Sequence, residues 1–270
     1  MSLQLHTFTI PFPGVTKKVI YHFSDCHLGI ADATSTPEET AAAEKAAREF
    51  DDCRRWFADH CQEPFDPTLS AQDYFEELLT ACGDGDAVLC AGDLVESFVP
   101  ATLGYVDEKT AHLPFMTVCG NHDTPEKFPE GYRLTAAKAP VQRMDLGDLL
   151  VLGFDDSKRV ITPEQLTALN EALAEDKPLI ILLHIPFAVP ENEALLRGCG
   201  EYFRLNHDDC PAENLAFIRL ITQHPHKIAA VLAGHLHFHH TCPVADNLTQ
   251  YVSSQGMCGH LNKYVIGETV

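Results

Sequence analysis

Basic residues are scarce in this chain. Its 270 residues include 19 Lys plus Arg against 39 Asp plus Glu, which leaves a formal net charge of −20. Such a surface repels long polyanions, because proteins bind nucleic-acid backbones by neutralising many phosphates with Lys and Arg. We therefore expect neither extended nucleic acid nor an anionic bilayer as a partner, although a single phosphate could still bind in a locally positive pocket.

Long apolar runs and paired cysteines are also missing. The longest apolar candidate, 179–187, is interrupted by His184 and Pro186, and a membrane helix needs about 20 apolar residues. The first 18 residues hold no apolar run of signal-peptide length. Ten cysteines are scattered without any C-x-x-C pair, which favours reduced thiols over a disulfide scaffold. We expect a cytoplasmic protein without a membrane segment, and the sequence does not indicate whether it has a protein partner.

Six short apolar runs predict buried strands. They lie at 19–24, 87–91, 115–119, 149–154, 179–183 and 228–233. Continuous apolar character is typical of strands that are buried on both faces, and the helical patterns between several of them indicate an α/β fold. Since no internal repeat or Ser/Gly-rich linker occurs, we expect one domain over residues 1–270.

Two helices are predicted between the first two of these strands. Thr36-Pro37-Glu38-Glu39 combines an N-cap, a proline at the first helical position and a capping-box glutamate, and an apolar stripe follows. Ser70 is the expected N-cap of the second helix, which should end at Gly83. We interpret residues 34–83 as a helical insertion, whose apolar stripe is either ordinary packing or part of a cap over the functional site.

Residues of metal-ligand type follow five of the predicted strands. They are Asp25 and His27, Asp93 in a Gly-Asp pair, Asn121 and His122 in a Gly-Asn-His-Asp run, His184, and His235 and His237 in a G-H-x-H run. Ligands of open α/β sheets bind at the carboxyl ends of the strands, so these side chains are expected to converge. Imidazole together with carboxylate suits Mn, Fe, Zn or Ni, and a shared carboxylate such as Asp93 can bridge two cations. The sequence therefore predicts a two-metal site.

The ordered blocks D-x-H, G-D, G-N-H-D, H and G-H-x-H, which run from Asp25 to His237, resemble those of the calcineurin-like metallophosphoesterases. The resemblance implies a four-layer αββα sandwich, with two mixed β-sheets flanked by helices and the metal site at the C-terminal ends of the strands. It implies two divalent or trivalent ions, with Mn, Fe or Zn expected. It also implies the ligands of each ion, which are Asp25, His27, Asp93 and His237 for one and Asp93, Asn121, His184 and His235 for the other.

Such a cluster could attract a phosphoester despite the acidic surface. Two divalent ions outweigh the negative charges of Asp25, Asp93 and a bridging hydroxide, and that hydroxide would serve as the nucleophile. His122 is the expected general acid for the leaving alkoxide, because imidazole titrates near neutral pH. Asp123 would orient or charge His122, and the resemblance implies the same two roles.

We therefore expect a metal-dependent phosphoric ester hydrolase that acts on a small soluble substrate, with phosphodiesterase favoured over phosphatase. The block 92–97 lacks the Arg that protein Ser/Thr phosphatases of the resembled family carry there. One alternative is a DNA-repair-type nuclease subunit, because 25–29 is similar to the D-x-H-L-G start of those enzymes, but the net charge argues against it. The other alternative is a non-catalytic, protein-binding scaffold, although such scaffolds typically lose a ligand or the acid His, and both are present here.

Overall fold

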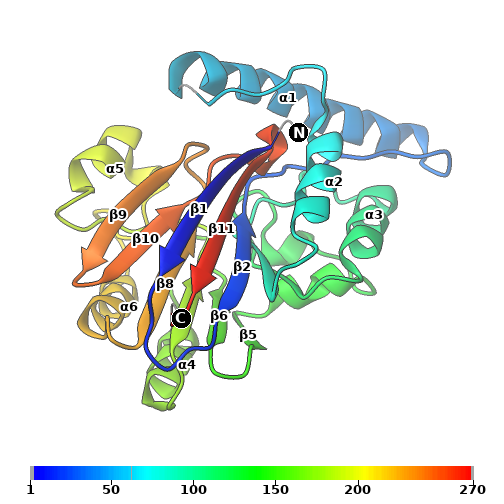
Figure 1. Cartoon of the computed structure of the whole chain (residues 1–270). Helices are drawn as coiled ribbons and strands as arrows, with labels where there is room; N and C mark the ends of the chain where they lie inside the picture. Colours follow the sequence, from blue (N-terminus) through cyan, green and yellow to red (C-terminus); the bar gives the residue numbers. More distant parts are fainter. Residues whose placement is uncertain (1–2, 62, 269–270) are drawn as a thin grey trace.

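The computed structural model describes residues 3–61 and 63–268, and its two β-sheets pack face to face with helices outside them (Figure 1). The first sheet has the order β1 (Gln4–Ile10), β11 (His260–Ile266), β2 (Lys18–Phe23), β3 (Ala87–Cys90) and β4 (Phe115–Thr117). Only the β11–β2 pair is antiparallel in this sheet, so β2, β3 and β4 run in one direction.

The second sheet is also mixed. Its order is β5 (Val141–Asp145), β6 (Leu150–Phe154), β7 (Leu179–Leu182), β8 (Ile228–Ala233), β10 (Leu248–Val252) and β9 (His240–Ala245). Its outer pairs, β5–β6 and β9–β10, are antiparallel, and the strands between them are parallel. The six apolar runs thus form β2, β3, β4, β6, β7 and β8, whereas five further strands were not predicted.

Helices lie on the outer faces of both sheets and across one end of the sandwich (Figure 1). They are α1 (Pro37–Cys61), α2 (Ala71–Ala81), α3 (Pro100–Thr110), α4 (Pro163–Ala174), α5 (Glu193–Cys199) and α6 (Ala212–Gln223), with the short 3-10 helices η1 (Pro125–Lys127), η2 (Arg133–Lys138), η3 (Glu201–Phe203) and η4 (Gly256–Cys258). No helix in the described ranges is both long enough and apolar enough to cross a membrane.

In the described residues, three large apolar cores and a smaller fourth one hold these layers together. One lies between the sheets and includes Ile20, Leu89, Val151, Ile180 and Leu232. The second packs the outer face of the first sheet on α2 and α3, and the third packs the outer face of the second sheet on α4 and α6. Strands buried on both faces require apolar residues at every position, which explains the continuous runs. The predicted four-layer sandwich is confirmed.

The helices α1 and α2 lie where the sequence predicted them. The backbone N–H of Thr36 donates to the Glu39 carboxylate while the Thr36 hydroxyl accepts from the Glu39 N–H, and Ser70 forms the same capping box with Asp73. The alanine stripe of α1 packs closely against the loop after β2. A Cβ added to Gly29 in that loop would lie only 2.8 Å from the Cβ of Ala46. That 34–83 is an insertion stays a prediction.

Candidate metal centre

Two ligand groups share Asp93 at the carboxyl ends of the central strands, and a third set of candidate ligands, His27, Glu96 and His122, shares His27 with the first. Asp25, His27, Asp93 and His237 form one group, and Asp93, His184 and His235 form the other, with the ligand atoms of each group within 4.8 Å of one another. These groups contain six of the seven predicted ligands. The seventh, Asn121, joins the second group, because its Oδ1 lies 2.9 Å from Nε2 of His184.

Asp93 lies between the two groups, as the sequence predicted. Its Oδ2 is 3.8 Å from Nε2 of His27 in the first group and 3.3 Å from Nε2 of His184 in the second. Its Oδ1 accepts a hydrogen bond from the backbone N–H of His122. The backbone of His122 thus fixes Oδ1 of Asp93, whereas Oδ2 faces imidazole nitrogens of both groups and could bridge two ions.

The backbone of the ligand loops is strained. Five of the seven described non-glycine residues with left-handed φ are predicted ligands, namely Asp25, His27, Asp93, His235 and His237. Left-handed residues other than glycine are uncommon and cluster at functional sites. Glycine is required beside them, since a Cβ on Gly120 would collide with the Asp93 carboxylate.

A buried carboxylate oxygen in the first group lacks a partner. Oδ2 of Asp25 accepts hydrogen bonds from the Ser24 hydroxyl and the backbone N–H of His235. Oδ1 has no hydrogen-bond partner of adequate geometry in the described residues, although Nε2 of His237 lies 3.2 Å away. Buried polar atoms are nearly always satisfied, so this oxygen and the imidazoles around it fit a bound cation.

The electrostatics of the cluster favour charged carboxylates. Burial raises the pKa of Asp25, but His237 and His184 lower it more strongly, to about 2. Burial lowers the pKa of His184, but Asp93 raises it more, to about 10. Two buried carboxylates therefore need positive charge beside them. Bound cations would supply it and leave the imidazoles neutral, which is the form that ligates metals.

Each ligand imidazole has a partner on its second ring nitrogen. The pairs are His27 Nδ1 with the Glu96 carboxylate (3.4 Å), His184 Nδ1 with the Ala91 carbonyl (2.7 Å), His235 Nε2 with the Tyr202 carbonyl (3.2 Å) and His237 Nδ1 with the Cys53 sulfur (3.5 Å). Such outer partners fix the orientation and tautomer of metal-binding histidines. In each of the four rings, one nitrogen is therefore held by its outer partner while the other nitrogen faces the ligand group.

His122 is the exposed member of the centre. Its side chain is 38% exposed, and its Nδ1 lies 2.8 Å from a Glu96 oxygen. Partial burial lowers the pKa of His122, but the Glu96 carboxylate and Asp93 raise it, and the net result is an increase. An accessible imidazole whose pKa is raised by neighbouring carboxylates suits a general acid.

The predicted role of Asp123 does not match its contacts. Its carboxylate accepts hydrogen bonds from the backbone N–H groups of Gly120, Asp93, Leu94 and Val95. Among the described residues, the carboxylate within hydrogen-bond distance of the His122 imidazole is Glu96 and not Asp123. Glu96 was not predicted, because it lies 26 residues before His122 and no spacing in the sequence links the two.

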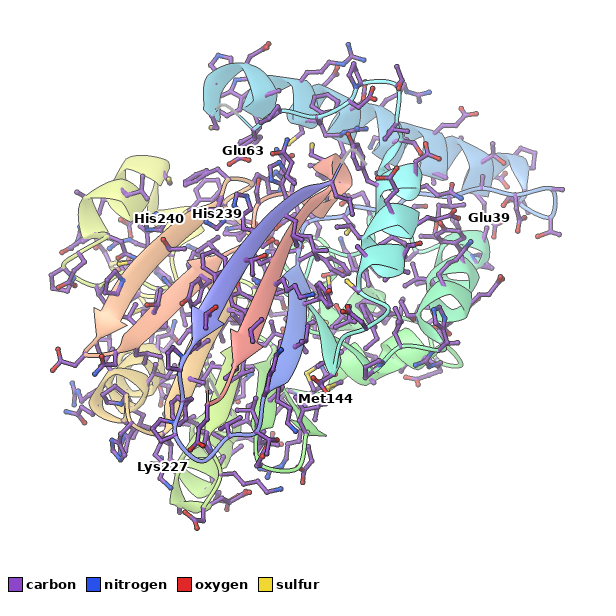
Figure 2. All side chains as sticks on the ribbon, in the orientation of Figure 1. Glu39, Glu63, Met144, Lys227, His239 and His240 are labelled. Carbon is purple, nitrogen blue, oxygen red and sulfur yellow. The ribbon has the colours of Figure 1, made fainter. Side chains whose placement is uncertain are left out.

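Helix α1 lies over the first ligand group, across one end of the two sheets (Figure 1). The ring of Phe50 stacks on His27 with 3.7 Å between centroids and 14° between planes, and the ring of Phe57 lies 5.1 Å from that of His237. Beyond the helix, Glu63 accepts a hydrogen bond from the backbone N–H of His239, close to the ligand loop (Figure 2). On the other side of the centre, Phe203 of η3 lies 5.0 Å from His235.

Comparisons with known proteins identify the family and the fold. The sequence model described as calcineurin-like phosphoesterase matches residues 18–239. A probable cyclic nucleotide phosphodiesterase from Synechococcus sp. is 28% identical over 159 residues, which are 56% of this chain and 58% of that protein. The chain thus matches little more than half the length of this curated relative. A dimetal phosphatase from Danio rerio superposes with a TM-score of 0.57 and 8% identity over 89% of this chain and 88% of the other, which shows a shared fold. The motif order, the fold and the match over 18–239 together place the chain in the calcineurin-like phosphoesterase family, whose enzymes are metal-dependent phosphoester hydrolases.

Proposed function

We propose that this chain hydrolyses a small phosphodiester with the help of two cations. One ion would be held by Asp25, His27, Asp93 and His237, and the other by Asp93, Asn121, His184 and His235. The observation that carries this proposal is the pair of buried ligand groups that share Asp93. Mixed imidazole and carboxylate ligands favour Mn, Fe or Zn over Mg or Ca.

The roles of the chain's own residues follow from their contacts. Cations bound there would neutralise the phosphoryl oxygens and activate a water molecule as the nucleophile near neutral pH. Glu96 engages Nδ1 of His122, so Nε2 is the nitrogen that can give its proton to the leaving oxygen. Asp123 would hold the loops of Asp93 and Asn121 in place through its backbone hydrogen bonds.

The preference for a diester rests on two observations. Residues 92–97 contain no Arg that would bind the extra charge of a monoester, and the relative from Synechococcus is named as a probable cyclic nucleotide phosphodiesterase. A cyclic nucleotide is therefore the first natural diester that we would test. Because all ten cysteines are free, we propose a reducing, cytoplasmic setting.

The test compares bis-p-nitrophenyl phosphate with p-nitrophenyl phosphate as substrates, after metal has been stripped from the protein and Mn²⁺ restored. We expect Mn²⁺-dependent diester turnover that falls about 10²–10⁴-fold in His122→Ala, the usual contribution of a general acid. His226→Ala is the matched control, since His226 is exposed and follows α6 outside the ligand groups. Preference for the monoester would make the chain a phosphatase. A folded, metal-loaded protein that is inert on both substrates and on cyclic nucleotides would refute the proposal and favour the scaffold alternative.

A further inference from the structure

One of the four ligand imidazoles is supported differently from the others. The second nitrogens of His27, His184 and His235 face oxygen atoms, whereas that of His237 faces the sulfur of Cys53. Cys53 belongs to α1, the helix that lies over the first ligand group. The first group therefore depends on a side chain from outside the strand-end loops that carry the ligands.

The geometry assigns the donor and the acceptor of this contact. Nε2 of His237 lies 3.2 Å from the unpartnered Oδ1 of Asp25 and 3.3 Å from Nε2 of His27, so Nε2 faces the ligand group. A nitrogen that binds a cation must carry no proton, and the neutral ring then carries its proton on Nδ1. Nδ1–H of His237 therefore donates to Sγ of Cys53, which lies 3.5 Å away.

The position of the sulfur is fixed by the helix. Phe50, Cys53 and Phe57 are three and four residues apart, which places them on one face of α1. Phe50 stacks on His27 and Phe57 packs beside His237, so two rings flank the thiol. Cys53 itself is not in either ligand group, because its sulfur faces the far side of the His237 ring.

Helix α1 is anchored at several points. Ala46 packs closely against Gly29, and the buried Arg54 donates from Nη2 to the Leu69 carbonyl at 2.7 Å. Beyond its C-terminal end, Glu63 holds the backbone N–H of His239 at 2.9 Å. Because the helix is tied both to the loop after β2 and to the loop that carries His237, its position sets the position of the thiol.

We propose that Cys53 is a positioning residue of the first metal site: its sulfur accepts the Nδ1–H of His237 and orients Nε2 towards the cation. This inference rests on the proposed two-metal function and deepens it. Docking of α1 and binding of the first cation then stabilise each other, because linkage between two equilibria is reciprocal. Among the described contacts none joins α1 to His184 or His235, so α1 reaches the second ion only through the shared Asp93.

The experiment measures metal binding without any substrate. Mn²⁺ is titrated by calorimetry into metal-stripped wild type, Cys53→Ala, Cys53→Ser and the control Cys61→Ala, which removes a half-buried thiol from the end of the same helix. We expect Cys53→Ala to weaken one of two Mn²⁺ sites about 10-fold, the low end of the range for outer-partner mutations. Cys53→Ser keeps an acceptor and should restore most of the affinity, while Cys61→Ala should bind as wild type does. Repeating the Cys53→Ala titration in a His235→Gln background assigns the weakened constant to the first group.

Each outcome has a defined meaning. Unchanged constants in Cys53→Ala, or equal weakening of both sites, would overturn the assignment of Cys53, whereas a wild type that binds no Mn²⁺ would overturn the metal function itself. If Cys53→Ala fails to fold, the role of Cys53 is tested by alkylation of the wild-type protein with iodoacetamide. Mn²⁺ should slow the modification of Cys53, followed by mass spectrometry, and leave unchanged the rate at Cys210, a half-buried thiol outside α1. Equal rates at Cys53 with and without Mn²⁺ would contradict the proposal.

Discussion

Removal of cations should destabilise this fold by a predictable amount. Asp25 and Asp93 are 0% and 1% exposed, so both charges are buried and are offset only by imidazoles when cations are absent. A ligand that binds only the native state at about 1,000 times its dissociation constant adds about 4 kcal/mol to the free energy of unfolding. One kcal/mol shifts the melting temperature of a 150–250-residue domain by about 2–4 °C. Each occupied site should therefore raise the melting temperature by about 8–16 °C, with the lower value favoured by the 270 residues of this chain.

The assay is thermal unfolding in EDTA and at increasing Mn²⁺. Two variants separate the increase in melting temperature into the contributions of the two sites. Asp93→Asn should lose the increments of both sites, because Asp93 belongs to both ligand groups. His235→Gln should lose only the increment of the second group. A wild type with the same melting temperature in EDTA and in saturating Mn²⁺ would refute the reasoning, and so would an Asp93→Asn variant that keeps a full increment.

Three further predictions separate the roles of the surrounding residues. Glu96→Gln should lower kcat for the diester about 10-fold at saturating Mn²⁺, because the 2.8 Å contact with His122 loses its charge; saturation is needed because Glu96 also contacts His27, and unchanged kcat would exclude the orienting role. Asp123→Asn should instead lower the free energy of unfolding in urea by about 2–4 kcal/mol, since an amide cannot accept all four backbone N–H groups, and a stability equal to wild type would contradict this. Burial lowers the pKa of His260 from 6.5 to about 4. As the pH drops below 6.5, His260 is therefore protonated in the unfolded chain before it is protonated in the folded one, and the free energy of unfolding decreases, by about 2 kcal/mol at pH 5. In EDTA, His260→Gln should reduce this loss between pH 7 and pH 5, and an equally steep loss in the variant would show that other groups cause it.

The central strands were predictable from sequence because they are buried on both faces, and the missed strands have another pattern. β1 alternates between exposed and partly buried residues, with Leu5 52% exposed, and β11 buries the polar side chains of His260 and Asn262. Such segments lack a continuous apolar run. Pairing with a neighbouring strand, rather than composition, makes them strands.

The convergence of the candidate ligands was predictable because each follows a predicted strand, and strand ends converge in this class of fold. The partner of His122 was not predictable in the same way. Asp123 is its neighbour in sequence, but the turn directs that carboxylate back to the backbone, whereas Glu96 reaches His122 from another strand-end loop. The apolar stripe of α1 indicated a buried face, but its contact with His27 and His237 arises only from the tertiary fold.

The left-handed backbone of the ligand loops has a consequence for the evolution of this chain. Five ligands hold a conformation that costs an ordinary residue of order 1–3 kcal/mol, and glycine adopts it without that cost. Exchange of such a ligand for glycine therefore removes strain together with function, and in the case of Asp25 or Asp93 it also removes a buried charge. Glycine at one of these positions should thus cost less stability than the loss of a buried side chain alone, so descendants of this chain can lose a candidate ligand and keep the fold.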